Sequence, residues 1–147
     1  VPVVLMHMQG EPETMQKTPR YADVVAEVVA FLERRIAACE QAGIARNRLL
    51  VDPGFGFGKT LAHNLELLRG LPRLASLGVP VLVGLSRKSL IGAITGAPVA
   101  RRLGGSIALA VLAAQRGARL LRVHDVEQTT QALAILAAVQ GVGEGDG

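Results

Sequence analysis

Short apolar runs alternate with longer segments of helical periodicity along the chain, at residues 3–6, 49–51, 79–83 and 120–123. Each run is rich in branched apolar residues and barely alternates with polar ones, which is typical of parallel strands covered on both faces. The first run stands at the start of the sequence with no lead-in. We therefore expect a parallel sheet whose strands are joined by helices.

The first two intervening segments carry apolar residues at helical spacing. Between residues 21 and 42 such residues recur at steps of three and four, and Gly43 suits the left-handed position that ends a helix. Residues 60–77 predict a second helical segment, which Pro72 is expected to divide. The apolar face predicted for that segment comprises Leu61, Leu65 and Leu68.

Two further helices are predicted at residues 101–116 and 126–140. Asp125 directly precedes the last helix, and Gln128 stands three residues after Asp125, which is a capping-box pattern. The remaining residues, 141–147, are rich in glycine and are expected to form a flexible tail.

The predicted order is a βα unit repeated four times, which fits either a doubly wound sheet or part of a (β/α)8 barrel. Both architectures place function at the carboxyl ends of the strands. Reactive side chains follow each predicted strand: His7 and Gln9, then Asp52, then Ser86 to Ser89, then His124 and Asp125 with Arg122 just inside. We expect one site built from several loops.

The glycine-rich segment 52–60 matches neither standard nucleotide-binding template. A P-loop would need glycine where Pro53 stands, and a dinucleotide fingerprint would need glycine in place of Lys59. What remains is an acid followed by a flexible loop that presents two phenylalanine rings. The carboxylate of Asp52 is able to accept two parallel N–H bonds from a planar, guanidine-like edge. The alternative is that Asp52 only caps the turn before Pro53.

Two neighbouring cations, Arg87 and Lys88, follow the third strand. Ser89 is placed to cap the next helix, whose free N–H groups attract an anion such as a carboxylate or a phosphate. The alternative is a solvated basic turn.

Strand alternation puts Arg122 and His124 on the same side, as a compact site for phosphate oxygens. The alternative is that His124 and Asp125 form only a hydrogen-bonded loop pair. His7 lies between two methionines beside a buried strand, a place where histidine is more often structural than catalytic.

Composition narrows the function classes. Half of the 147 residues are apolar and 19% are charged, so a sizeable core is expected and disorder is excluded. We expect no membrane span, because no apolar run reaches eighteen residues. The lone Cys39 fits a reducing cytoplasm, and it and the three histidines are too scattered for a finger-type zinc site. The net charge of +4 is dispersed among few aromatic residues, which favours anionic small molecules over nucleic acid as partners.

At these residues the chain resembles the dihydropteroate synthase family, folate-pathway enzymes that sulfonamides inhibit. The most specific strings are Asp-Pro-Gly-Phe-Gly-Phe-Gly-Lys at 52–59 and Ser-Arg-Lys-Ser at 86–89. The resemblance covers residues 5–10, 12, 14–16, 42–44, 50–59, 63–64, 82–89, 102–103, 105–106 and 122–125.

The resemblance implies an α/β fold of the (β/α)8 TIM-barrel class, of which residues 1–140 supply the last four βα units. It implies a cytoplasmic transferase that condenses 6-hydroxymethyl-7,8-dihydropterin pyrophosphate with p-aminobenzoate to give 7,8-dihydropteroate. Pyrophosphate leaves in a Mg2+-assisted step, and no ligand for that metal is implied in this chain. Homodimerisation through the helices at 101–116 and 126–140 is also expected.

Three catalytic residues are implied by the resemblance. Asp52 would hold the amino and ring N–H edge of the pterin, Lys88 would bond the ring from the other side, and Arg122 would stack near the pterin. Further substrate contacts are implied for Met6 and Gly84 along the pterin, Phe57 and Ser89 around the ring and carboxylate of p-aminobenzoate, and His124 beside Arg122 at the pyrophosphate.

The four units correspond to the second half of the family's barrel. We therefore expect a fragment or C-terminal half that is inactive alone, with two open sheet edges. One alternative is a methyltransferase that uses methyltetrahydrofolate, which would have no pyrophosphate to hold at Arg122 and His124. Another is a non-catalytic pterin-binding or dimerisation module.

Overall fold

Four parallel strands form one sheet in the computed structural model, which describes residues 1–8 and 22–141. The strands lie side by side in chain order: β1 (Val3–Met6), β2 (Leu49–Asp52), β3 (Val81–Val83) and β4 (Ala118–Leu121). This order and the helix between each pair of strands confirm the predicted α/β class of repeated βα units.

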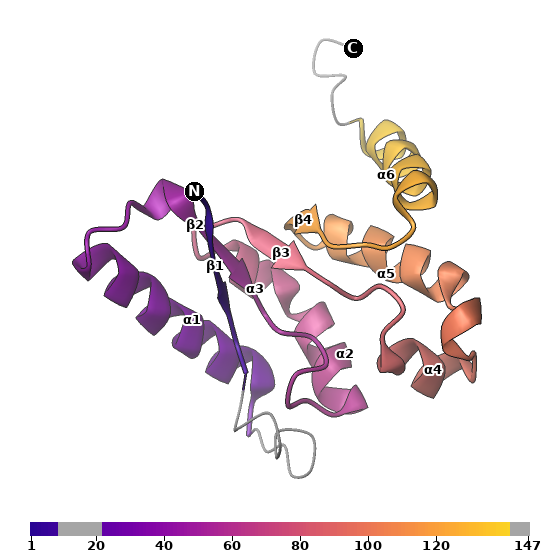
Figure 1. Cartoon of the computed structure of the whole chain (residues 1–147), viewed down its shortest axis with the longest axis horizontal. Coiled ribbons are helices and arrows are strands. Elements are labelled where there is room, and N and C mark those ends of the chain that lie inside the picture. The colour runs from indigo at the N-terminus through magenta and orange to yellow at the C-terminus, as the bar shows by residue number, and fades with distance from the viewer. Residues whose placement is uncertain (9–21, 142–147) are drawn as a thin grey trace.

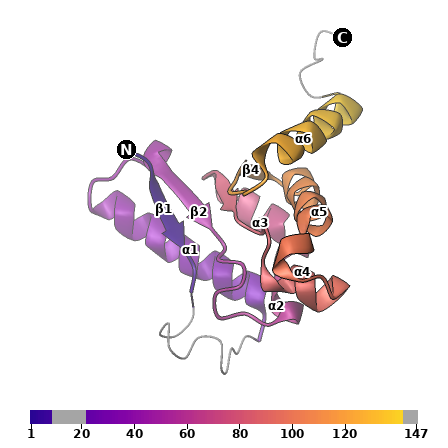
Figure 2. The same ribbon diagram turned by 45° about the vertical axis from the view of Figure 1, so that its right-hand side comes forward.

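Helices connect the strands and extend beyond β4, where α6 packs beside α5 (Figure 1). Figure 2, turned by 45°, shows the same order from β1 and α1 at one end to α6 at the other. The α-helices are α1 (Val24–Gln41), α2 (Leu61–Arg69), α3 (Leu71–Ala75), α4 (Ser89–Thr95), α5 (Leu103–Gln115) and α6 (Val126–Gln140). Short 3-10 turns occupy Arg46–Arg48 and Val99–Arg101. None of the helices within the described ranges is both long and apolar enough to cross a membrane.

The two faces of the sheet differ in burial. Val51, Val81 and Val83 are at most 1% exposed and belong to one core with the buried face of α1. Alternate positions face the other way, where Val4 and Leu120 remain 41% and 42% exposed. The sheet therefore buries one face under helices and leaves the other more open, as a sector of a barrel does.

Local signals set most helix boundaries. Asp23 caps α1, its carboxylate accepting the Ala26 N–H at 3.1 Å, and Gly43 has the predicted left-handed φ of +92°. The break between α2 and α3 falls at Gly70, and Pro72 lies in the first turn of α3, where its missing N–H costs no helical bond.

Two predictions need correction, one of a helix face and one of a strand boundary, and some predictions fall on residues that the structure does not describe. The buried positions of α2 are Asn64, Leu67 and Leu68, so the predicted face was wrong at Leu61, which is exposed, and at Leu65, which is half-buried. The last strand begins and ends two residues earlier than predicted, after an irregular register with β3. Gln9, the matched residues 10, 12 and 14–16, and tail residues 142–147 lie outside the described residues.

Candidate functional site

Residues at or just beyond the ends of the four strands face the open side of the sheet. Met6 pairs with Asp52 across β1 and β2. On the other side Leu82 pairs with Leu120, so alternation places Gly84 and Arg122 on that face two residues further on. The Arg122 N–H donates to the Val83 carbonyl at 2.9 Å, which continues the ladder past the end of β4.

Asp52 has a different partner on each carboxylate oxygen. Oδ1 accepts the Gly54 N–H at 2.8 Å, and Oδ2 lies 3.7 Å from Nη1 of Arg122. The residue is 3% exposed, whereas the Arg122 side chain is 61% exposed. One oxygen therefore caps the turn, and the other faces the open side of the sheet; binding of a planar N–H edge by this carboxylate stays a prediction.

The Asp52–Arg122 ion pair spans β3, since β3 lies between β2 and β4. Gly84 follows β3 and lies beneath the Arg122 side chain. A Cβ atom built on Gly84 would lie 3.5 Å from Nη1 of Arg122, an ordinary van der Waals distance. The Arg122 guanidinium therefore passes over Gly84 toward Asp52.

The glycine-rich loop folds back over the strand ends. Gly54, Gly56 and Gly58 all have positive φ, and a Cβ on Gly54 would overlap the His7 carbonyl oxygen. The expectation of two presented rings was wrong for Phe55, whose ring is 1% exposed and belongs to the core. Only Phe57 stays half-buried at the site.

Lys88 crosses from the next loop to meet this one. Its ammonium donates to the Phe55 carbonyl at 2.7 Å and lies 5.1 Å from the centre of the Phe57 ring. Burial lowers the pKa of Lys88, while Asp52 acts to raise it and Arg122 to lower it further. Beside it is a hollow of about 220 Å³, lined by Phe55, Gly56, Phe57, Asn64, Lys88, Ser89 and Leu90.

Ser89 does not cap α4 as predicted. Lys88 occupies the cap position with extended backbone, no side chain caps the helix, and Ser89 is its first residue. The preceding Arg87 has a left-handed φ of +60°, and the helix starts one residue earlier than predicted. Ser89 still lines the hollow beside Lys88.

Arg87 points to the loop after β4 and not to Asp52. Its guanidinium pairs with the Asp125 carboxylate at 2.9 Å, and the backbone N–H of Arg87 donates to Ser106 Oγ at 2.9 Å. The capping box predicted for Asp125 was therefore wrong, because its carboxylate makes no cap to α6 and pairs with Arg87.

His124 joins the third and fourth strand ends. Its Nδ1 lies 2.9 Å from Ser86 Oγ, which also accepts the His124 N–H at 3.3 Å. The alternative of a His124 pair with Asp125 fails, since these two side chains bond to Ser86 and Arg87 respectively.

His7 is 5% exposed and has a packing role, as its position predicts. Its ring meets Phe31 edge-on at 5.0 Å, and Nδ1 lies 3.1 Å from Nζ of Lys59. Burial, and to a smaller extent the Lys59 charge, lowers the pKa of His7 to about 4. The ring is therefore neutral at physiological pH.

Acidification is expected to destabilise the protein through His7. The unfolded histidine binds a proton near pH 6.5 and the folded one only near pH 4, so the unfolded state gains protons as pH falls between these values. This linkage predicts a loss of about 1–2 kcal/mol from pH 7 to pH 5, measured by urea unfolding of the complete protein that carries this chain. His7→Asn should flatten that slope, and an equal slope in both proteins would contradict it.

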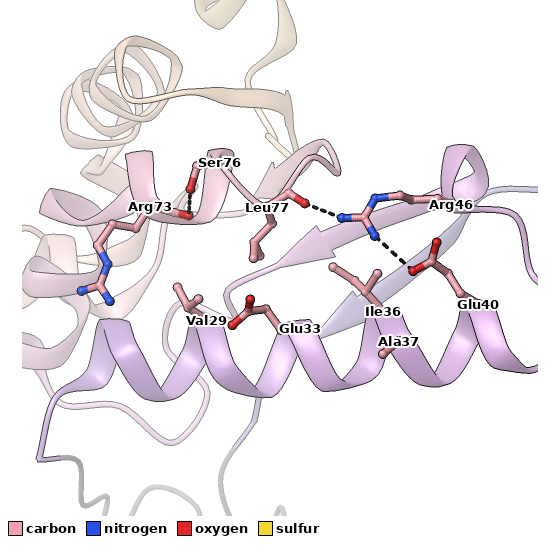
Figure 3. A pocket seen from close by; sticks show the side chains of 9 residues that line it. All are labelled: Val29, Glu33, Ile36, Ala37, Glu40, Arg46, Arg73, Ser76 and Leu77. Carbon is pink, nitrogen blue, oxygen red and sulfur yellow. Dashed lines mark hydrogen bonds and ion pairs between the residues drawn. The ribbon is translucent and has the colours of Figure 1, made fainter.

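A larger hollow of about 410 Å³ lies on the helical layer, between α1 and α3 (Figure 3). There Arg46 donates to the Glu40 carboxylate at 3.1 Å and to the Leu77 carbonyl. Val29, Glu33, Ile36, Ala37, Glu40, Arg46, Arg73, Ser76 and Leu77 line it. None of the predicted site residues contributes to it, so the candidate site is the cluster at the strand ends.

Sequence reasoning placed Ser86 at the site but assigned no loop-holding role to it or to Lys59, Asn64 and Ser106. Lys59 and Asn64 are buried under the glycine loop, where Asn64 accepts the Gly56 N–H at 2.9 Å. Ser86 and Ser106 accept bonds from the His124 and Arg87 N–H groups. Most of their partners are backbone groups, which leave no residue-type signal, and the other partners are histidines distant in the sequence.

Comparison with known proteins agrees with this geometry. The family described as pterin binding enzyme matches residues 1–124. The chain is 53% identical over 138 residues to dihydropteroate synthase of Escherichia coli strain K12, covering 94% of this chain and 49% of the relative. It is 51% identical to the Haemophilus influenzae dihydropteroate synthase over 138 residues, 94% of this chain and 50% of the relative. The chain thus spans about half the length of these relatives.

Solved structures give the same result. A Yersinia pestis dihydropteroate synthase with a sulfonamide drug complex superposes with a TM-score of 0.93 at 49% identity, over 96% of this chain and 52% of that one. The Xanthomonas albilineans enzyme in complex with 7,8-dihydropteroate gives 0.88 at 59% identity, over 97% of this chain and 52% of that one.

Proposed function

Because the chain belongs to the pterin binding enzyme family, we propose that it supplies the C-terminal half of a dihydropteroate synthase. The complete enzyme joins 6-hydroxymethyl-7,8-dihydropterin pyrophosphate to p-aminobenzoate and releases pyrophosphate. The observation that carries this proposal is the buried Asp52 carboxylate facing Arg122 across Gly84, with Lys88 on the neighbouring loop.

Asp52 is the pterin anchor in this proposal. Its Oδ2 has Arg122 at 3.7 Å, beyond hydrogen-bond distance, so this oxygen is available to the amino and ring N–H edge of a pterin. Departure of pyrophosphate leaves positive charge spread into the pterin. A fixed, buried carboxylate stabilises that charge more in the transition state than in the ground state.

Lys88 and the hollow beside Phe57 hold the two reacting partners together. Lys88 bonds the pterin from the side opposite Asp52, while Met6 and Gly84 line the pterin slot. The 220 Å³ hollow suits the ring of p-aminobenzoate, with Phe57 and Ser89 on its wall. The amine then attacks the pterin methylene carbon, and proximity is the main contribution of the protein.

Arg122 and His124 serve the leaving group. Both are exposed at the carboxyl end of β4, where a diphosphate has access. Mg2+ belongs to the proposal for the complete enzyme, but within residues 1–8 and 22–141 no three His, Cys, Asp or Glu side chains gather as a metal site. No described residue is therefore named as a ligand of the metal, and no step is assigned to it.

The alternatives explain less. A methyltetrahydrofolate-dependent methyltransferase has no diphosphate for Arg122 and His124 to hold, and the relatives at about 50% identity are named dihydropteroate synthase. A non-catalytic pterin-binding module leaves the hollow beside Lys88 without a second substrate.

A homodimer in the cytoplasm completes the proposal. The exposed apolar side chains of Leu112, Ile135 and Val139 on α5 and α6 support a dimer face on these helices. The free thiol of Cys39 is compatible with a reducing compartment.

Arg122→Ala tests the leaving-group assignment. We expect the variant of the complete protein to bind the pterin pyrophosphate about 10–100-fold more weakly, because a charge-assisted contact to phosphate is lost. Binding of the pterin without its diphosphate should change less. The matched control is Arg119→Ala, which removes an exposed arginine within β4. Calorimetric titration measures these affinities. If both variants lost affinity equally, or if neither lost affinity, Arg122 would not belong to the site.

A further inference from the structure

We propose that Lys59 is a positioning residue, whose buried ammonium clamps the glycine-rich loop onto the end of β1 and so fixes the wall of the p-aminobenzoate hollow. The inference rests on the proposed function for the identity of that substrate. The clamp itself follows from contacts that lie beneath the loop.

The Lys59 ammonium has a complete set of acceptors. Nζ donates to the Gly54 carbonyl at 2.8 Å and to the Phe57 carbonyl at 3.0 Å, and it lies 3.1 Å from His7 Nδ1. An ammonium has three N–H donors, so each finds one partner. Lys59 is only 4% exposed, and lysine is rarely buried to this extent unless it is fully paired.

These partners join the two ends of the loop to a neighbouring strand. Gly54 follows Asp52 by two residues, and its N–H is bonded to the Asp52 carboxylate while its carbonyl is bonded to Lys59. Phe57 contributes its ring to the hollow and to the contact with Lys88. One buried group therefore sets the backbone of both the pterin side and the p-aminobenzoate side of the candidate site.

The surrounding charges make this clamp sensitive to protonation. Asp52 at the end of β2 favours the charged form of Lys59, whereas Lys88, on the loop before α4, disfavours it. His7 on the β1 side is neutral at physiological pH and acts as an acceptor. Burial is the largest cause and lowers the pKa of Lys59 to about 8. Above that pH a neutral amine has two N–H donors for three acceptors, and the loop loses one tie.

Lys59→Met in the complete protein is the direct test, because it keeps the length of the stem and removes the charge and the donors. We expect the KM for p-aminobenzoate to rise at least tenfold, with a smaller change in kcat. Hydrogen exchange of the amides at residues 54–58 should accelerate at least tenfold, while amides in α1 keep their protection. The control is Arg101→Met, which removes an exposed cation and should change neither quantity.

The pH profile of the unmodified protein is a second test that needs no variant to fold. The KM for p-aminobenzoate should rise between pH 7 and pH 9 as Lys59 loses its proton, and Lys59→Met should remove this rise. An unmodified KM that is flat over this range would overturn the proposal. The proposal would also be overturned if hydrogen exchange at residues 54–58 were unchanged in Lys59→Met. It would be overturned as well if exchange accelerated equally in α1, because that result marks a general loss of stability. Absence of turnover in the unmodified protein would overturn the proposed function, while loop exchange would still decide the clamp.

Discussion

Replacing Asp52 with asparagine is expected to lower the affinity for the pterin pyrophosphate and the rate of dihydropteroate formation by about 100-fold or more. Asparagine has the shape of aspartate, and its Oδ1 retains the acceptor that holds the Gly54 N–H. The second position changes from a charged oxygen to an amide NH2, which faces Arg122 and the pterin edge with donors. The loss therefore reports on charge and not on the turn.

Calorimetric titration and steady-state kinetics of the complete protein measure this effect. Asp23→Asn is the matched control, since Asp23 is an exposed cap of α1 whose side-chain acceptor also survives the change. Near-normal affinity and turnover in Asp52→Asn would remove this carboxylate from the pterin site.

The second large effect is expected at Gly54, where alanine should destabilise the protein by about 3 kcal/mol or more. Its φ of +73° disfavours any side chain, and a Cβ atom would overlap the carbonyl oxygen of His7. That oxygen belongs to the backbone at the end of β1, so relief requires the loop and the strand to separate.

Gly43→Ala isolates the steric part of this loss. Gly43 has a similar left-handed φ of +92°, but nothing lies within 4 Å of the position of its Cβ. We expect about 1 kcal/mol there, from backbone strain alone. Chemical unfolding of the two variants gives the difference directly, and equal losses would mean that the loop does not approach β1 as closely as the structure shows.

The periodicity of apolar residues along the chain was sufficient to predict the sheet and to place the site at the carboxyl ends of its strands. The branched apolar runs predicted all four strands, and the polar motifs that follow them placed Asp52 and Arg122 at the strand ends, where the structure brings them together. Because strand ends of a parallel sheet meet at one edge, adjacent polar motifs could be assigned to one site before any contact was known.

Contacts between distant segments decided what periodicity could not. Asp125 and Ser89 stand where capping residues are favoured, but Arg87 takes the Asp125 carboxylate and α4 already begins at Ser89. Phe55 and Phe57 are chemically identical, yet one fills the core and the other faces the hollow. A propensity along the chain carries no information about which distant group competes for a side chain.

The burial of Lys59 shows the same limit. Its three partners are two carbonyls within its own loop and a histidine 52 positions earlier in the chain. In sequence, Lys59 serves only to exclude a dinucleotide-binding motif. Its place beneath the loop becomes visible once His7 and the glycine turns are brought together by the pairing of β1 with β2.

We propose that this chain supplies the C-terminal half of a dihydropteroate synthase. Pyrophosphate release by the complete protein, measured with each substrate alone and with both together, tests it most directly. We expect one pyrophosphate for each dihydropteroate formed, only when both substrates are present, with the rate lost in Asp52→Asn and kept in Asp23→Asn. A protein that binds the pterin pyrophosphate but releases no pyrophosphate when p-aminobenzoate is added would contradict it.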